Sequence, residues 1–239
     1  MNLKALGEAY TGGGKRYVLI TEVTRMGNGD VCVAGLDIHT GMMVRPLQTG
    51  GQNWEEDKWV AKGYLVPGNL LLLTPASAGN PAYPHATEDF RVSKVGYVTS
   101  ISAADLYSIC VEAAVSDIDT IFDGKIIDNK YVTANTHCRS LGSIVVPVNK
   151  LKAQAPFGKP QISFKDDWGI WHNLTVTELQ TKNAGDAEAG AAALSLRLRN
   201  SPPGLAVLRL GLARAWGGAN QEYDPPRCYL QLNGLILPA

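Results

Sequence analysis

The chain has 239 residues, of which 45% are hydrophobic and 18% charged, so it is long enough to bury one large core or the cores of two domains. Its 22 basic and 22 acidic side chains cancel, which excludes a large, uniformly basic nucleic-acid surface. No apolar run approaches the roughly 18 residues that a membrane span needs, so we expect a cytoplasmic protein without a membrane partner.

The charge is unevenly distributed along the chain. Residues 105–130 contain six acidic residues and two lysines, a local charge of −4, so the rest of the chain carries +4. A local basic groove is therefore compatible with a neutral total.

The four cysteines are Cys32, Cys110, Cys138 and Cys228. They lie far apart and form no CxxC pair, which is not the spacing of a structural zinc site. We interpret them as small buried hydrophobic residues and expect no metal and no other cofactor.

The first elements predict a tail and then strands. Residues 1–14 are expected to form a flexible tail, because Gly12-Gly13-Gly14 would be costly to order. The run 17–23, YVLITEV, is rich in β-branched residues and predicts a strand. A hairpin is expected over residues 31–47, with its turn at His39-Thr40-Gly41. We expect Arg45-Pro46 to end the return strand, because proline cannot donate to a ladder.

The middle of the chain predicts two further strands and a helical insert. Strands are expected within 63–74 and 89–101, with an irregular loop over 76–86 between them. Residues 103–122 are the best candidate for helix, capped by Ser102 and with a second short helix towards the end.

The last third predicts a second hairpin and two closing strands. The hairpin strands are 161–165 and 171–176, joined by a turn rich in Asp and Gly. Residues 183–193 are interpreted as a surface insertion, with a helix after Asp186 as one interpretation. Strands are expected at 205–211 and 227–237, with a long loop over 212–226.

Many short strands without βαβ alternation predict a mainly β fold of two small β-barrels with a short helical insert. We expect the tail over 1–14, an N-terminal domain with the helical insert over 15–135, and a C-terminal domain over 136–239.

Five segments, in order, are similar to the dual-OB-containing domain family of prokaryotes. The resemblance covers nearly the whole chain after residue 15, although Met42-Met43 stands where the family often has an aromatic residue, and Ala213 and Ala215 replace more polar residues or proline. The segments are CVAGLDIHTGMMVRPL at 32–47, RSLG at 139–142, the hairpin residues Ser163-Phe164, Asp166, Gly169 and Val176-Thr177-Glu178, RLGLAR at 209–214, and YLQLNGL at 229–235. The resemblance implies two OB-like barrels and a nucleic-acid-binding role in a defence or repair setting, with a protein partner encoded nearby.

The first functional hypothesis is a non-catalytic module that binds single-stranded DNA or RNA. OB barrels stack bases on aromatic side chains and hold phosphates with Arg and Lys. Candidate binding residues are Arg25, Arg45, Arg139, Arg209, Arg214, Trp216, Tyr229 and Gln231, with Arg227, Tyr223 and Trp54 as further candidates. A structural interpretation stays open for Arg45 and Arg139, which would pair with a nearby acid such as Asp37, and for Trp54, which would pack in the core.

Two alternatives remain. The binding groove of an OB barrel would also suit a small-nucleotide sensor or a protein–protein interaction domain, in which Gln231 and Asn233 recognise the polar edges of the ligand. The neutral total charge favours this alternative. A hydrolase would need Asp37 with His39, or His137 with Cys138, but neighbouring strand residues point to opposite faces and neither pair has a visible third member. We therefore predict no catalytic residues.

Overall fold

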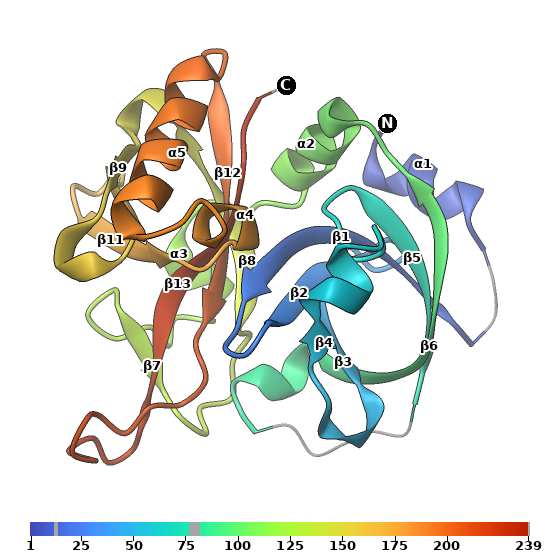
Figure 1. The fold of residues 1–239 in the computed structure, drawn as a ribbon, viewed down its shortest axis with the longest axis horizontal. Coiled ribbons are helices and arrows are strands. Elements are labelled where there is room, and N and C mark those ends of the chain that lie inside the picture. Colours follow the sequence, from blue (N-terminus) through green and yellow to red (C-terminus); the bar gives the residue numbers. More distant parts are fainter. Residues whose placement is uncertain (12–13, 77–81, 239) are drawn as a thin grey trace. The chain divides into compact units, whose positions relative to one another are not determined.

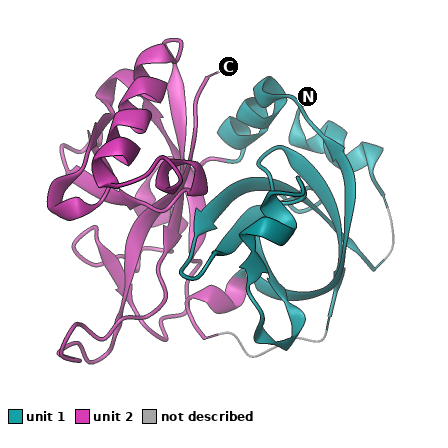
Figure 2. Ribbon diagram, in the orientation of Figure 1, with its two compact units in different colours: residues 1–80, 88–113, 239 teal, residues 81–87, 114–238 magenta. Residues whose placement is uncertain are grey.

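The chain is mainly β and divides into two compact units. The computed structural model describes residues 1–11, 14–76 and 82–238. Unit 1 comprises Met1–Asn80 with Glu88–Ala113, and unit 2 comprises Pro81–Thr87 with Ala114–Pro238 (Figure 2). Apart from the segment 81–87, the main change of unit along the chain falls between residues 113 and 114. The domain boundary predicted from the sequence lies between 135 and 136.

Unit 1 is a closed barrel of five strands, β1, β2, β3, β5 and β6, which curl around one another in Figure 1. Its elements are α1 (Leu3–Ala9), β1 (Arg16–Arg25), β2 (Asp30–Asp37), β3 (Met43–Gln48), η1 (Thr49–Gly51), β4 (Trp54–Glu55), η2 (Glu56–Val60), β5 (Asn69–Pro75), β6 (Asp89–Ser100) and α2 (Ala103–Glu112). The path β1–β5–β6–β3–β2 is closed by pairing of β1 with β2. Among the strand pairs in the described part of unit 1, only β3 and β6 run parallel.

Unit 2 contains a sheet of the same plan with helices added. Its elements are η3 (His85–Thr87), α3 (Ile118–Ile121), β7 (Tyr131–Thr133), β8 (Leu141–Pro147), η4 (Val148–Lys150), β9 (Lys152–Gln154), η5 (Pro156–Gly158), β10 (Gln161–Lys165), β11 (Trp171–Val176), α4 (Leu179–Lys182), α5 (Ala187–Asn200), β12 (Leu205–Leu212) and β13 (Arg227–Ile236). The sheet follows the path β8–β12–β13–β11–β10–β9, and only β11 and β13 run parallel.

The two units share one strand order. If the five barrel strands of unit 1 are numbered along the chain, they lie in the spatial order first, second, third, fifth, fourth, with the third and fifth parallel. Unit 2 gives the same order when β8 and β9 are read as one first strand, broken by the single turn η4. The expected pair of small β-barrels is thus confirmed as a fold class, with helical inserts at α2–α3 and at α4–α5.

Both predicted hairpins are present. β2 and β3 pair antiparallel, as do β10 and β11, which span 161–165 and 171–176 as the turn chemistry predicted. The prediction that Arg45-Pro46 ends the return strand is wrong, because β3 continues to Gln48. The ladder between β2 and β3 stops at Val44. Beyond it β3 pairs with β6, and the backbone N–H of Arg45 donates to the carbonyl oxygen of Glu88, the residue before β6, at 2.8 Å, so the strand continues through Pro46 on a different partner.

The N-terminal segment contains a helix where a tail was expected. Asn2 caps α1 by accepting the backbone N–H of Ala5, and Leu6 is buried. Gly7 lies so near Ile38 that an added Cβ would come within 2.9 Å of the Ile38 carbonyl oxygen, which places α1 against the turn after β2. The interpretation of Gly12 and Gly13 as a linker, and part of the loop expected over 76–86, lie outside the described residues.

The helices of the inserts differ from their expected bounds. The helix and the second short helix expected within 103–122 are present as α2 and α3, each with its own cap, Ser102 and Asp117. The helix after Asp186 is present as α5, which extends seven residues beyond the insertion expected to end at residue 193. Trp54 packs in the core, only 3% exposed, and its Nε1 donates to the carbonyl oxygen of Pro46 at 2.8 Å.

The core of unit 2 is a single cluster between its sheet and helices. It includes the inward residues of the barrel strands, together with residues of α3 and α5, among them Phe122, Phe164, Leu194, Leu208 and Leu232. The alternation along β11 and β13 leaves the opposite face for polar and aromatic side chains.

Candidate functional site

The outer face of unit 2 gathers polar and aromatic residues on its third and fifth strands. Along β11, His172 is buried while its neighbours Trp171 and Asn173 are exposed. Thr175 of β11 pairs in register with Gln231 of β13, and side chains of registered residues point to the same side of a sheet. Tyr229 is two residues before Gln231 and so lies on that side as well.

The loop between the fourth and fifth strands, residues 213–226, adds Arg214 and Trp216 to this face. Backbone hydrogen bonds run in both directions between Trp216 and Arg227, each at 2.9 Å, and fix the loop where it joins β13. Trp216 also packs edge-on against Tyr223, with ring centroids 5.6 Å apart, and against Tyr229 at 6.0 Å. Its side chain is therefore held in place, yet the residue stays 47% exposed.

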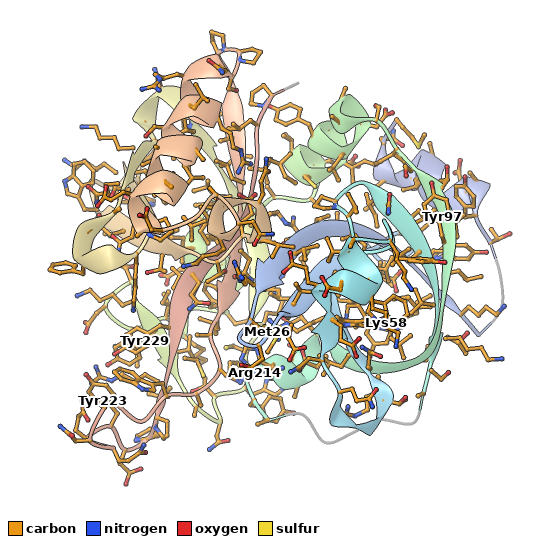
Figure 3. The ribbon with its side chains drawn as sticks, viewed as in Figure 1. Met26, Lys58, Tyr97, Arg214, Tyr223 and Tyr229 are labelled. Atoms are coloured by element: carbon orange, nitrogen blue, oxygen red, sulfur yellow. The ribbon has the colours of Figure 1, made fainter. Side chains whose placement is uncertain are left out.

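Arg227 is enclosed by tyrosines at the base of this loop. Its guanidinium lies 3.8 Å from the ring centroid of Tyr223 and 4.4 Å from that of Tyr131. The hydrogen bond from Arg227 to the hydroxyl of Tyr229 is the main cause that raises the pKa of the guanidinium. The pKa of Tyr223 is also raised, chiefly by its hydrogen bond with Tyr229. At neutral pH the cluster therefore consists of a cation and neutral aromatic rings. Figure 3 shows Tyr223 in the loop and Tyr229 on β13.

The residues of β11 and β13 described above, with Arg214 and Trp216 of the loop, line one groove of about 540 Å³, entirely within unit 2, which we call the β11–β13 groove. Arg227, Tyr223 and Tyr131 lie beside this lining and are not part of it. Its cations are Lys130, Lys159 and Arg214, and its one acidic group is Asp128. Its lining residues are Asp128, Asn129, Lys130, Lys159, Trp171, His172, Asn173, Leu174, Thr175, Ala213, Arg214, Trp216, Tyr229, Leu230 and Gln231. A net charge of +2 together with two exposed tryptophans suits a short, flat, anionic ligand.

Four of the eight candidate residues from the sequence are brought together in this groove: Arg214, Trp216, Tyr229 and Gln231. Sequence reasoning missed Trp171, Asn173 and Lys159. The alternation of WHNLTV carried the signal for the first two, since it placed Trp171 and Asn173 on the face opposite Leu174.

The other four candidates lie elsewhere. Arg25 is exposed at the end of β1 in unit 1. Arg45 is 4% exposed and its Nη1 donates to Asp89 Oδ1 at 2.9 Å, so its partner is Asp89 rather than Asp37. This ion pair joins the parallel strands β3 and β6, where the two residues are in register.

Arg139 and Arg209 both make structural contacts within unit 2. Arg139 donates from Nη2 to the carbonyl oxygen of Thr120 at 2.7 Å and lies 3.7 Å from Asp123, so it ties the end of α3 to the approach to β8. Arg209 is fully buried and its Nη1 donates to Ser143 Oγ at 3.1 Å, across the β8–β12 ladder. We therefore leave Arg25, Arg45, Arg139 and Arg209 out of the interface proposed below.

The pairs considered for hydrolysis have other contacts. The Asp37 carboxylate accepts the backbone N–H groups of His39 and Thr40, at 3.1 and 3.3 Å, and so shapes the turn after β2. His137 packs against Tyr83, with ring centroids 4.9 Å apart. Within the described ranges, no three His, Cys, Asp or Glu side chains are grouped to hold a metal ion. Over the same part of the chain, no helix has the length and apolar content to cross a membrane.

The family is decided by a comparison of the sequence with family models. The model described as "Dual OB-containing domain" matches residues 15–235, nearly the whole chain. The chain belongs to this family. As a dual OB-containing domain, it has two units with one strand order, as the family description implies.

Two further comparisons give less. A search of curated proteins with the sequence of this dual OB-containing domain found no match. Among solved structures it is similar to one described as "Crystal structure of the tetrameric p202 HIN2", with 10% sequence identity and a TM-score of 0.32, over 95% of this chain and 96% of that chain.

Proposed function

We propose that unit 2 binds single-stranded nucleic acid in the β11–β13 groove. The observation that supports this most directly is the position of the groove in the strand order. OB-folds bind oligonucleotides on the face of their second and third strands and with the loops between strands one and two and strands four and five. The β11–β13 groove is lined by the third strand, by the loop 213–226 between the fourth and fifth strands, and by Lys159 from the loop between β9 and β10.

The chemistry of the lining supports the same ligand. Trp171 and Trp216 are 57% and 47% exposed and offer faces on which bases stack, which contributes about 1–3 kcal/mol per base. The three cations of the groove, Lys130, Lys159 and Arg214, are enough to contact about three phosphates. With single strands, each neutralised phosphate contributes a slope of about −0.7 to the dependence of log K on log salt, so the slope should not be steeper than about −2.

Fluorescence anisotropy with labelled single-stranded DNA and RNA of 12 nucleotides tests the proposal. Trp171→Ala should weaken binding by roughly tenfold or more, the loss of one stacked base. Trp168→Ala is the matched control, because Trp168 is 84% exposed on the same hairpin but does not line the groove. Arg214→Ala should make the salt slope shallower by about 0.7. No binding at low salt, or an equal loss in the two tryptophan variants, would contradict the proposal.

A second candidate is a sensor of a single small nucleotide. The volume of the groove falls in the range of about 300–1,000 Å³ that small-molecule sites occupy. A nucleotide at 100 times its dissociation constant would stabilise the protein by about 2.7 kcal/mol, which a thermal-shift panel detects. Affinity that rises with oligonucleotide length favours the first candidate, whereas equal affinity for a mononucleotide and an oligomer favours the second.

The resemblance also suggested a cytoplasmic protein in a prokaryotic defence or repair setting, with a protein partner encoded nearby. These stay predictions. The groove supports only the nucleic-acid part of them.

A further inference from the structure

A chain of hydrogen bonds, which we call the relay, crosses three strands beside the β11–β13 groove. Gln154 Nε2 on β9 donates to Ser163 Oγ on β10 at 2.6 Å, and Ser163 Oγ donates to Asn173 Oδ1 on β11 at 2.7 Å. Gln154 Nε2 also lies 3.4 Å from Asn173 Oδ1. Ser163 is 5% exposed and in register with Asn173, so the relay belongs to the sheet and not to a mobile surface.

In the structure the relay runs from Gln154 towards Asn173 and so orients the amide of Asn173. An unrestrained amide can turn over and present either its oxygen or its nitrogen, so it accepts or donates as the ligand requires. The oxygen of Asn173 is engaged by Ser163 and Gln154, whereas its nitrogen makes no hydrogen bond to any residue of the described ranges. Asn173 is exposed and lines the groove. What it offers a ligand is therefore an N–H donor.

We propose that Asn173 is a specificity-determining residue that donates a hydrogen bond to the carbonyl edge of an unpaired base. The inference rests on the proposed function and names the bases that the groove prefers. Guanine and thymine or uracil carry an exocyclic oxygen, O6 or O4, where adenine and cytosine carry an amino group, N6 or N4. A fixed donor meets an acceptor in the first group and another donor in the second.

The stacking residues position the base for this contact. Trp171 precedes Asn173 by two residues on the same side of β11, so a base stacked on the indole has its edge over the sheet. Stacking itself tolerates any base, since every base has a π-face. Selection therefore falls to the polar floor of the groove, where Thr175 and Gln231 have hydroxyl and amide groups of adaptable polarity and Asn173 has a donor.

The experiment compares two oligonucleotides whose bases differ by this exchange of oxygen for amine at position 4, with the accompanying change of the ring N3 from a donor in uracil to an acceptor in cytosine. Kd is measured by anisotropy for 12-mers of deoxyuridine and of deoxycytidine with the full chain. The wild type should bind the deoxyuridine 12-mer about three- to tenfold more tightly, the range expected for one net hydrogen bond. Asn173→Asp keeps the acceptor for Ser163 but replaces the N–H donor by an oxygen, so the preference should vanish or reverse towards deoxycytidine.

Two controls separate polarity from charge and folding. Ser163→Ala leaves Asn173 in place but frees its oxygen, so the ratio of the two Kd values should fall towards one with the protein folded, as checked by circular dichroism. Trp168→Ala should leave the ratio unchanged. If Asn173→Asp weakens both 12-mers equally, or if the wild type binds them equally, the inference is overturned while the proposed function stands. If neither binds, both are overturned.

Discussion

Replacement of Arg45 by alanine should destabilise unit 1 strongly and leave the proposed nucleic-acid site of unit 2 intact. The side chains of Arg45 and Asp89 are 5% and 1% exposed, so neither group is hydrated. Burial by itself would lower the pKa of Arg45, but the electrostatic interactions with Cys32, Asp89 and Glu88 outweigh it, and the pKa is raised. Alanine at position 45 removes the partner of a buried carboxylate, and breaking such a pair costs about 3–5 kcal/mol.

That cost is large for unit 1, which contains about one hundred residues. For a domain of this size each kcal/mol shifts Tm by about 4–8 °C, so Tm should fall by at least about 12 °C. The assays are thermal unfolding for Tm and urea unfolding for the free energy, both followed by circular dichroism, with hydrogen exchange to locate the loss in β3 and β6. Arg25→Ala is the matched control, since Arg25 is an exposed strand-end arginine of the same unit and should change stability by no more than about 0.5 kcal/mol. If Arg45→Ala lowers the free energy of unfolding by less than about 1 kcal/mol and also weakens oligonucleotide binding, this reasoning is refuted and Arg45 contacts the ligand.

Three smaller perturbations test other parts of the structure. Gly142→Ala should lower the free energy of unfolding by about 1–3 kcal/mol in urea titrations, because the new Cβ would lie 2.6 Å from Cγ2 of buried Ile121, and an unchanged midpoint would show that α3 does not pack there. Phe157→Asn should raise the free energy of unfolding by up to about 1 kcal/mol, because Phe157 is 97% exposed and has a φ of 56°, which asparagine tolerates better. A loss of stability in this variant would contradict the prediction. Asp117→Ala should cost about 0.5–2 kcal/mol at pH 7, because Asp117 caps α3. The Ser116 hydroxyl and the backbone N–H of Thr120 hold the pKa of Asp117 below its usual value, so the contribution is present above the unfolded pKa of about 3.9 and is lost as pH falls through the folded pKa. The gap between Asp117→Ala and wild type in urea titrations should narrow below about pH 4, and a constant gap would argue against the cap.

Sequence patterns predicted the hairpins well because their signals are local. The alternation of WHNLTV and the turn residues around Gly169 depend only on neighbours in the chain, and β10 and β11 have the expected bounds. Pro46 was misjudged because its effect depends on which strand lies beside it. The parallel partner β6 comes from more than forty residues further on, and no local rule announces it.

The candidate site was predicted in part for a similar reason. Arg45 and Arg209 follow strand patterns that do not distinguish an open face from a covered one, so both were candidate contacts, with a structural role left open for Arg45, although both are buried. Arg214 and Trp216 were found because a long loop with an arginine and a tryptophan stands out in composition. The polarity of Asn173 was out of reach, since it is set by Ser163 and Gln154 on two other strands.

The break in the first strand of unit 2 has a consequence for motion. β9 has three residues and follows the turn η4. It lies at the end of the described sheet path, where it pairs with β10 at three registered positions. Short edge segments of this kind open locally at a free energy well below that of global unfolding. Because Gln154 is the last residue of β9, each such opening would withdraw the first donor of the relay and let the amide of Asn173 turn over. If Asn173 selects bases as proposed, the fidelity of that selection would be limited by how often β9 detaches, and the helix α5 that packs against β9 would act on selectivity without touching the ligand.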